Sequence, residues 1–180
     1  MTQARIRTER LILRTWRADD RPPFARMNAD PEVMRHMLKP LASEESDAFV
    51  DGIEKHFAEH GFGLWAVELR GDTEFIGFVG RSIPRFEAPF MPAVEVGWRL
   101  DRRFWGHGYA TEAARAAVAD GFERVGLREL VSFTIPANIR SIRVMERIGL
   151  TRDPAGDFEH PNVPEGHPHR HHVLYRIAAP

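Results

Sequence analysis

The sequence predicts a single domain, 1–180, of the mixed α/β class (α+β by some conventions). Its length of 180 residues suits one domain with a full hydrophobic core. Runs with apolar residues at every second position indicate strands, and they alternate with runs whose apolar residues recur every three or four positions, which indicate helices. No repeat, linker or low-complexity tract divides the chain.

The first part of the chain predicts one strand and then helices. Residues 8–16 alternate as a strand does. Either aspartate at 19–20 can cap a helix. The prolines at 22–23 agree with a helix that starts there, because proline is tolerated only in the first turn. Asp30-Pro31 predicts a second helical start, with the aspartate as cap and the proline at the first helical position. A longer helix is expected over 43–61, with acidic residues near its positive end and a glycine at its close.

The rest of the chain predicts a sheet with two further helices. Strands are expected over 64–69 and 75–83, joined by a tight turn at 70–73, and a proline-rich, apolar loop follows over 84–92. The later elements are a strand at 93–100, a helix at 110–124, a strand at 130–135, a helix at 141–148, a long polar loop at 153–168 and a final strand at 172–177.

Composition excludes several classes of function. The net charge of −1 gives no basic field for nucleic acid or an anionic membrane, so neither is an expected partner. The absence of cysteine excludes disulfides, thiolate metal ligands and a cysteine nucleophile. No apolar leader and no run of eighteen apolar residues is present, so a cytoplasmic location is expected.

One stretch carries the strongest functional signal. The alternating strand that ends at Leu100 leads into Arg103-x-x-Gly106-x-Gly108 and then into an amphipathic helix. A glycine turn at a helix N-terminus collects unpaired N–H groups that suit phosphate. A Walker loop is excluded because Tyr109 and Ala110 follow where lysine and serine or threonine would stand, and a dinucleotide fingerprint does not fit either. The sequence therefore predicts a phosphorylated cofactor; a glycine turn of purely structural use and a nucleotide-phosphate site remain alternatives.

These motifs resemble those of the GNAT superfamily of acyl-CoA N-acyltransferases, in the branch that includes the Rim-type ribosomal-protein N-terminal acetyltransferases. The matching residues are the RxxGxG motif at 103–108 with its continuation at 109–113, Asn138-x-x-Ser141, the run 146–150 and the opening strand at 9–14. The resemblance implies a GNAT fold: a mixed, mostly antiparallel sheet of six or seven strands flanked by about four helices. It also implies a V-shaped splay between the strands of Val94 and Val131 that admits acetyl-CoA.

The resemblance implies which residues bind the acetyl-CoA cosubstrate. N–H groups from Arg103 to Tyr109 would hold the pyrophosphate, backbone of the strand at 95–100 would pair with the pantetheine amides, and Asn138 would bind the pantetheine arm. For Asn138 the alternative is a turn or helix-cap asparagine. The expected cofactor-binding residues are Trp98, Leu100, Arg103, Trp105, Gly106, His107, Gly108, Tyr109, Ala110, Asn138 and Ser141.

Two residues are the catalytic candidates. Glu95 interrupts a strand with apolar neighbours, and a partly buried carboxylate has a raised pKa suited to taking the proton of an amine. The alternatives are a salt bridge with an arginine such as Arg81 or Arg99, or a solvated sheet face; Glu68 and Glu74 are weaker candidates for the base.

The second candidate acts at the leaving group. Many GNAT enzymes place a tyrosine acid where this chain has Met145, so that acid is in doubt. Serine at position 141 is shared with the Rim-type branch, and its hydroxyl is the expected proton donor to the leaving sulfur, or else a helix cap.

Five histidines crowd the C-terminal region without the spacing of a metal site, so no metal is expected and a solvated or substrate-facing loop is favoured. They are His160, His167, His169, His171 and His172. Of these, His169 and His171 lie two positions apart, and one of them is a candidate for substrate contact. The four tryptophans are expected in the core or in a pocket wall.

The predicted reaction is acetyl transfer from acetyl-CoA to a primary amine, by direct attack in a ternary complex. A protein N-terminus and a small-molecule amine both stay open as acceptors, and so do a monomer and a homodimer. The alternative from another class is a catalytically silent module of the same fold that binds acyl-CoA as a sensor or scaffold.

Overall fold

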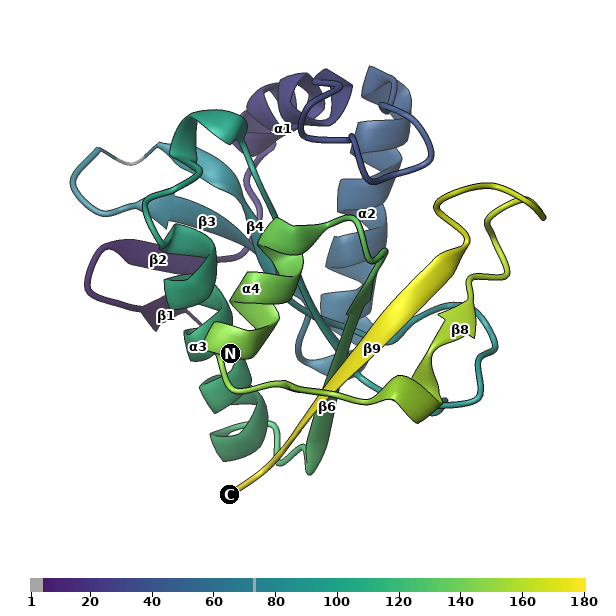
Figure 1. The fold of residues 1–180 in the computed structure, drawn as a ribbon. Helices are drawn as coiled ribbons and strands as arrows, with labels where there is room; N and C mark the ends of the chain where they lie inside the picture. Colours follow the sequence, from purple (N-terminus) through teal and green to yellow (C-terminus); the bar gives the residue numbers. More distant parts are fainter. Residues whose placement is uncertain (1–4, 73) are drawn as a thin grey trace.

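The computed structural model describes residues 5–72 and 74–180, and within these ranges one continuous sheet joins strands from both ends of the chain (Figure 1). The sheet order is β1-β2-β3-β4-β5-β6-β9-β7, and β8 pairs with β9 beside it. The strands are β1 (Ile6–Arg7), β2 (Leu11–Arg14), β3 (Leu64–Leu69), β4 (Phe75–Ser82), β5 (Glu95–Leu100), β6 (Glu129–Thr134), β7 (Thr151–Arg152), β8 (Phe158–Glu159) and β9 (His171–Ala178).

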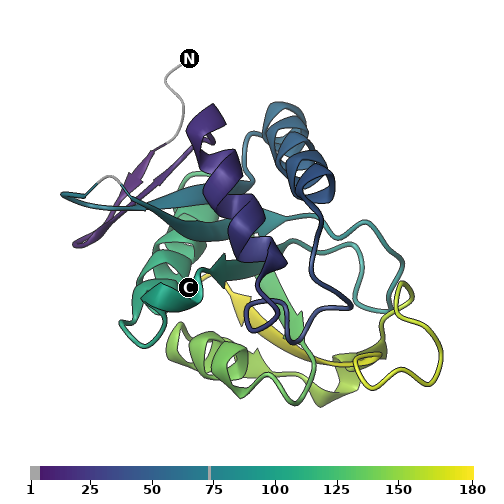
Figure 2. The same ribbon diagram turned by 90° about the horizontal axis from the view of Figure 1, so that it is seen from above.

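Four α-helices cover the two faces of the sheet. They are α1 (Arg21–Ala29), α2 (Ser43–His60), α3 (Tyr109–Glu123) and α4 (Ile139–Arg147). Figure 2 shows α1 and α2 on one side of the sheet and α3 and α4 on the other. Each pair of helices encloses its own core, with Phe24, Val50 and Phe78 on the first side and Val96, Ala114 and Leu130 on the second.

The ends of α2 follow from local chemistry. The Glu45 carboxylate accepts a hydrogen bond of 2.8 Å from the N–H of Ala42, at the positive end of the helix. Gly61 ends the helix in the left-handed conformation, with φ 73°. Both ends agree with the sequence prediction for 43–61.

Strand β5 alternates between the two faces. Val96 and Leu100 are buried against α3, whereas Arg99 reaches Asn28 of α1 on the opposite side. By the same period of two, Glu95 and Gly97 share the face of Arg99. The helix pair α1 and α2 therefore lies on the side to which Glu95 points.

The strands β5 and β6 separate directly after they meet. They are the one parallel pair among the described strands, and their register contains a single pair, Glu95 with Val131, supported by a 2.9 Å bond from the N–H of Val131 to the Val94 carbonyl. Every other described pairing is antiparallel. The mostly antiparallel sheet, the four helices and the splay between these two strands confirm the predicted fold class.

Some local predictions differ from the structure. The expected helix at Asp30-Pro31 is a series of turns over 31–36. The Asp30 carboxylate accepts a hydrogen bond from the N–H of Glu32, as in an Asx turn, and only isolated backbone hydrogen bonds follow. The sheet has nine described strands rather than six or seven, since β1, β7 and β8 have two residues each and are too short to show a period. Thr73, in the turn expected at 70–73, lies outside the described residues.

The predicted first strand, 8–16, is in fact the short strand β2 preceded by a turn. The C-terminal strand β9 begins one residue earlier than predicted, and the long loop before it contains the short strand β8. No helix within 5–72 and 74–180 is both long and apolar enough to cross a membrane.

Candidate active site

The glycine turn before α3 has the features of an anion cradle. Gly106 and Gly108 have φ values of 81° and 80°, which residues with a Cβ rarely adopt, and an added Cβ on Gly106 would meet open space. The first helical hydrogen bond runs from Glu112 to the Gly108 carbonyl. Hydrogen bonds among the described residues use none of the backbone N–H groups of residues 106–111. Six consecutive unpaired donors at a helix N-terminus fit a pyrophosphate.

The N-terminal part of the chain fixes this turn in place. The Glu112 carboxylate accepts bonds from the Thr8 hydroxyl at 2.6 Å and from Arg10 at 2.7 Å. Arg10 also donates to the His107 carbonyl at 2.9 Å, and its guanidinium lies 4.7 Å from the centre of the Tyr109 ring. The loop that would hold the cofactor is therefore positioned before any ligand arrives.

The other residues predicted to bind the cofactor have distinct surroundings. The Arg103 side chain pairs with Asp101 and Glu74, so its charge is already partnered. The Leu100 side chain is buried in the core, and its carbonyl accepts a 2.9 Å bond from the Trp105 indole. Contacts between the backbone of these residues and a ligand remain a prediction.

Four further predicted cofactor residues also have identified surroundings. Ala110 packs against the core beneath the start of α3, and the His107 and Tyr109 rings stack with 5.4 Å between their centres. Trp98 lines the cavity described below.

The start of α4 shows which residue caps the helix. Asn138 is the N-cap: its side-chain oxygen accepts from the Ser141 N–H at 3.3 Å, and its amide donates to the Thr134 hydroxyl at 3.0 Å. Ser141 is therefore not the cap. It lies within the first turn, and both residues line the cavity.

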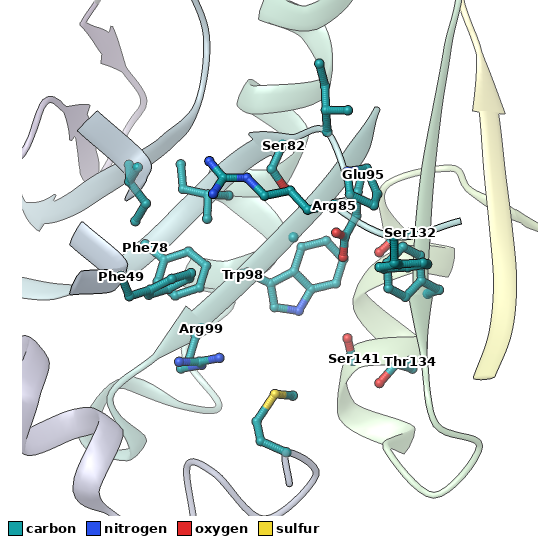
Figure 3. Close-up of a pocket in the computed structure, with 18 of the residues that line it drawn as sticks. Phe49, Phe78, Ser82, Arg85, Glu95, Trp98, Arg99, Ser132, Thr134 and Ser141 are labelled. Atoms are coloured by element: carbon teal, nitrogen blue, oxygen red, sulfur yellow. The ribbon is translucent and has the colours of Figure 1, made fainter. Parts of the chain in front are cut away.

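A cavity of about 580 Å³ lies where β5 and β6 separate (Figure 3). Its lining joins β5 and β6 to α2, to the loop after β4 and to the start of α4. The polar or charged residues that line it include Ser82, Arg85, Glu95, Arg99, Ser132, Thr134, Asn138 and Ser141. The volume is typical of a small-molecule site.

Glu95 enters this cavity without a partner. Within the described part of the chain its carboxylate makes no hydrogen bond or ion pair, and burial raises its pKa to about 8. The alternative of a salt bridge is wrong: Arg81 pairs with Asp120, and Arg99 donates to Asn28 at 2.8 Å. Gly97, two residues on, leaves the space beside the Glu95 carboxylate free.

The weaker base candidates lie elsewhere. Glu68 is buried between Arg14 and Arg17, with its carboxylate 2.6 and 3.1 Å from their nitrogen atoms. Glu74 pairs with Arg103, outside the cavity lining. Met145, at the position where many GNAT enzymes have a tyrosine, is a buried core residue.

Of the five C-terminal histidines, the two that reach the cavity are not the pair expected from the sequence. His160 and His172 line it, with ring centres 5.0 Å apart, whereas His169 and His171 do not. Burial and the neighbouring His172 lower the pKa of His160 to about 4, so it is neutral near pH 7. No group of three potential metal ligands occurs among residues 5–72 and 74–180.

Comparison of the sequence with known protein families shows the family of this chain. The family profile described as "Acetyltransferase (GNAT) domain" matches residues 10–151. The chain belongs to the GNAT acetyltransferase family. GNAT acetyltransferases use acetyl-CoA, and the unpaired amides at 106–111 fit that cosubstrate.

Related proteins support the same assignment. The chain is 30% identical over 149 residues to the uncharacterized protein YkkB of Bacillus subtilis, covering 82% of this chain and 86% of that protein. It is 33% identical over 162 residues to FsC-acetyl coenzyme A-N(2)-transacetylase of Aspergillus fumigatus, covering 83% of this chain and 66% of that protein.

Solved structures agree with the fold. An acetyltransferase from Agrobacterium tumefaciens superposes with a TM-score of 0.80 at 30% identity, over 99% of this chain and 96% of its own. The ribosomal L7/L12 alpha-N-protein acetyltransferase RimL, in complex with coenzyme A, has a TM-score of 0.76 at 19% identity, over 97% and 98% of the two chains. The second likeness shows the fold alone.

Proposed function

We propose that this GNAT protein transfers the acetyl group of acetyl-CoA to a primary amine, by direct attack in a ternary complex, with Glu95 as the general base. The observation that carries the proposal is the partnerless Glu95 carboxylate in the cavity at the splay of β5 and β6. A carboxylate with a pKa near 8 is well matched to an amine that arrives protonated near neutral pH.

The proton transfers follow from what an amine needs in order to attack. Glu95 accepts a proton from the ammonium form, directly or through water, and the free amine then attacks the thioester carbonyl carbon. The new C–N bond forms as the C–S bond breaks, and the second proton lost by the nitrogen balances the proton that the departing sulfur gains. Because a thioester is already activated, no covalent enzyme intermediate is required, and the protein contributes positioning and electrostatics.

Ser141 is the proposed proton donor to the departing sulfur. Since Asn138 caps α4, the Ser141 hydroxyl is not needed as a cap, and it lines the same cavity as Glu95. Figure 3 shows the Ser141 hydroxyl beside that of Thr134, on the side of the pocket formed by α4 and β6. This location suits a leaving group that emerges from the splay.

Backbone rather than side-chain groups would hold the cosubstrate. The N–H groups of residues 106–111 are the proposed pyrophosphate ligands, and the separated edges of β5 and β6 would admit the pantetheine arm. Acetyl-CoA binding and acetyl transfer to nitrogen are also named for the Aspergillus relative.

A small-molecule amine is the acceptor class that we favour over a protein N-terminus. The cavity volume lies within the range for small ligands, and the lining closes around it from α2, the loop after β4 and the start of α4. The likeness to RimL, at 19% identity, supports the Rim-type branch only at the level of fold.

A matched pair of glycine variants tests the cradle. Gly106→Val and Gly126→Val place the same side chain at φ 81° and φ 76°, in both cases with open space around the added Cβ. Gly126 follows α3 at the far end from the cradle and serves as the strain control. In calorimetry with acetyl-CoA, Gly106→Val is expected to lose affinity by about tenfold or more while Gly126→Val retains it. Equal affinities would refute the cradle.

Thiol release from acetyl-CoA across a panel of amines tests the reaction itself. Release that depends on an amine supports the transferase. Tight acetyl-CoA binding without release by any amine would favour the silent acyl-CoA-binding module instead.

A further inference from the structure

A second charged side chain in the cavity is unexplained by the proposed reaction. Arg99 lies on the same strand face as Glu95, four residues further along β5, and both line the cavity (Figure 3). No step of the acetyl transfer described above requires a guanidinium there.

Arg99 is held firmly, yet it lacks an anionic partner. One guanidinium nitrogen donates to the Asn28 side chain at 2.8 Å, and Asn28 is fixed in turn by Ser46 at 2.9 Å. The group lies 5.8 and 5.4 Å from the centres of the Phe49 and Phe78 rings. Among the described residues no carboxylate lies within ion-pair distance of Arg99.

Its remaining donors face the cavity. An arginine has five N–H donors, and Asn28 accounts for one hydrogen bond. The buried side-chain nitrogens or oxygens without a partner in the described part of the chain are Trp65 Nε1 and Arg81 Nε, so the unused nitrogens of Arg99 are not sealed in the core. Burial nevertheless lowers the pKa of Arg99 to about 10, which shows that the surroundings lack a compensating negative charge.

The two charges are separated by a distance that a ligand can span. Four residues of extended strand place the Cα atoms of Glu95 and Arg99 about 13 Å apart. Burial is the only cause of either pKa shift, so neither group compensates the other. Arg85 adds a second guanidinium to the lining, whereas Glu95 is the one carboxylate among the described residues that line it.

We propose that the acceptor is an amine that carries an anionic group, such as a carboxylate, remote from its nitrogen, with the amine at Glu95 and the anion bound by Arg99. This inference rests on the proposed acetyl transfer and specifies its acceptor. The anionic end of such a ligand meets the Arg99 guanidinium, whose bidentate fork suits a carboxylate, and the amine end meets the Glu95 carboxyl group. The aromatic rings of Phe49, Phe78 and Trp98 supply an apolar wall for the body of the ligand.

The cavity also excludes some acceptors. Two arginines against one carboxyl group oppose a polycationic amine. Burial lowers the pKa values of His160 and His172, two of the lining histidines, so these rings are neutral near pH 7 and supply no charge that would attract a polycation. A polyamine such as spermidine is therefore expected to be a poor acceptor.

Matched acceptors test the inference. The probes are ε-aminocaproate and para-aminomethylbenzoate, each compared with its carboxamide, which has a similar shape and no negative charge. With the wild-type protein, kcat/KM from thiol release is expected to favour each carboxylate over its amide by about 10- to 100-fold, as for a charged hydrogen bond. The difference should lie mainly in KM, because Arg99 binds a remote group and not the reacting atoms.

Variants locate the effect at Arg99. Arg99→Gln is expected to reduce the carboxylate-to-amide ratio to about one, and Arg99→Lys to keep part of it. Arg128→Gln removes the same charge from an exposed position outside the cavity and should leave the ratio unchanged. Circular dichroism and thermal melting confirm that each variant is folded.

Two results distinguish failure of this inference from failure of the proposed function. If amines react but carboxylates and amides react equally, or if Arg99→Gln leaves the ratio intact, the anion site is wrong and the transferase stands. If no amine reacts, calorimetry of N-acetyl-ε-aminocaproate on the CoA-bound protein still tests the site: binding lost in Arg99→Gln supports it, and no binding to wild type refutes it.

Discussion

The pH dependence of the reaction gives the sharpest test of Glu95. Burial raises its pKa to about 8, and a general base acts only when it is deprotonated. With that pKa, about one Glu95 side chain in ten is ionised at pH 7 and about nine in ten at pH 9. The kcat/KM for an amine is therefore expected to rise about tenfold over this interval from Glu95 alone.

The amine titrates as well, so the two ionisations must be separated. A primary alkylamine has a pKa near 10, and its own deprotonation also increases the rate with pH. Glu95→Gln retains the shape of the side chain and removes its titration. The ratio of wild-type to Glu95→Gln activity then reports Glu95 alone, and it is expected to reach about 100-fold at high pH, the lower end of the range for general-base catalysis.

The assay is thiol release from saturating acetyl-CoA, measured from pH 6 to pH 10 with one fixed acceptor. The expected ratio is smallest at low pH, where Glu95 is already protonated, and levels off above its pKa. Glu123→Gln, an exposed carboxylate on α3, controls for a general change in charge. A ratio that is constant across this range would refute the assignment of Glu95 as the base.

The same titration affects stability in a direction that can be checked. The folded pKa of about 8 lies above the ordinary value of 4.5, so between these values the folded protein holds a proton that the unfolded chain has released. This contribution to stability is present below pH 4.5 and is lost as the pH rises to about 8. The melting temperature of Glu95→Gln relative to wild type is therefore expected to increase from pH 5 to pH 8.5. An unchanging difference would contradict the raised pKa.

Three further substitutions have expected outcomes. Ser141→Ala should lower kcat by about tenfold or more with little change in KM, as loss of a general acid does; full activity in steady-state kinetics would leave the leaving-group acid unassigned. Asn138→Ala should lower the free energy of unfolding by about 1 kcal/mol through loss of the α4 cap, and Asn138→Ser, which can still cap, should restore most of it in urea denaturation. Asp120→Ala leaves the fully buried Arg81 guanidinium without its carboxylate and should cost about 3–5 kcal/mol; a cost below 1 kcal/mol would show that the Ala117 carbonyl suffices.

The cofactor half of the site could be predicted from local sequence, because its parts are continuous in the chain. Strand β5, the glycines at 106 and 108 and helix α3 follow one another, so their order alone implies amides gathered at a helix start. A signal for Arg99 was also present: it lies two and four positions from Gly97 and Glu95, on one face of a strand. The sequence did not show that this face borders a cavity.

The sequence by itself determined the fold class, the GNAT motifs and Glu95 as a candidate base, since periodicity, glycine spacing and capping residues act over a few neighbouring positions. Tertiary structure alone decided which side chains share the cavity. His160 and His172 line it because β8 and β9 pair. Arg99 is oriented by its hydrogen bond to Asn28 of α1, which is 71 residues away in the chain. Whether Glu95 had a salt-bridge partner was likewise decided in space: Asp120 and Asn28 already engage Arg81 and Arg99, so the carboxylate is left free in a desolvated cavity.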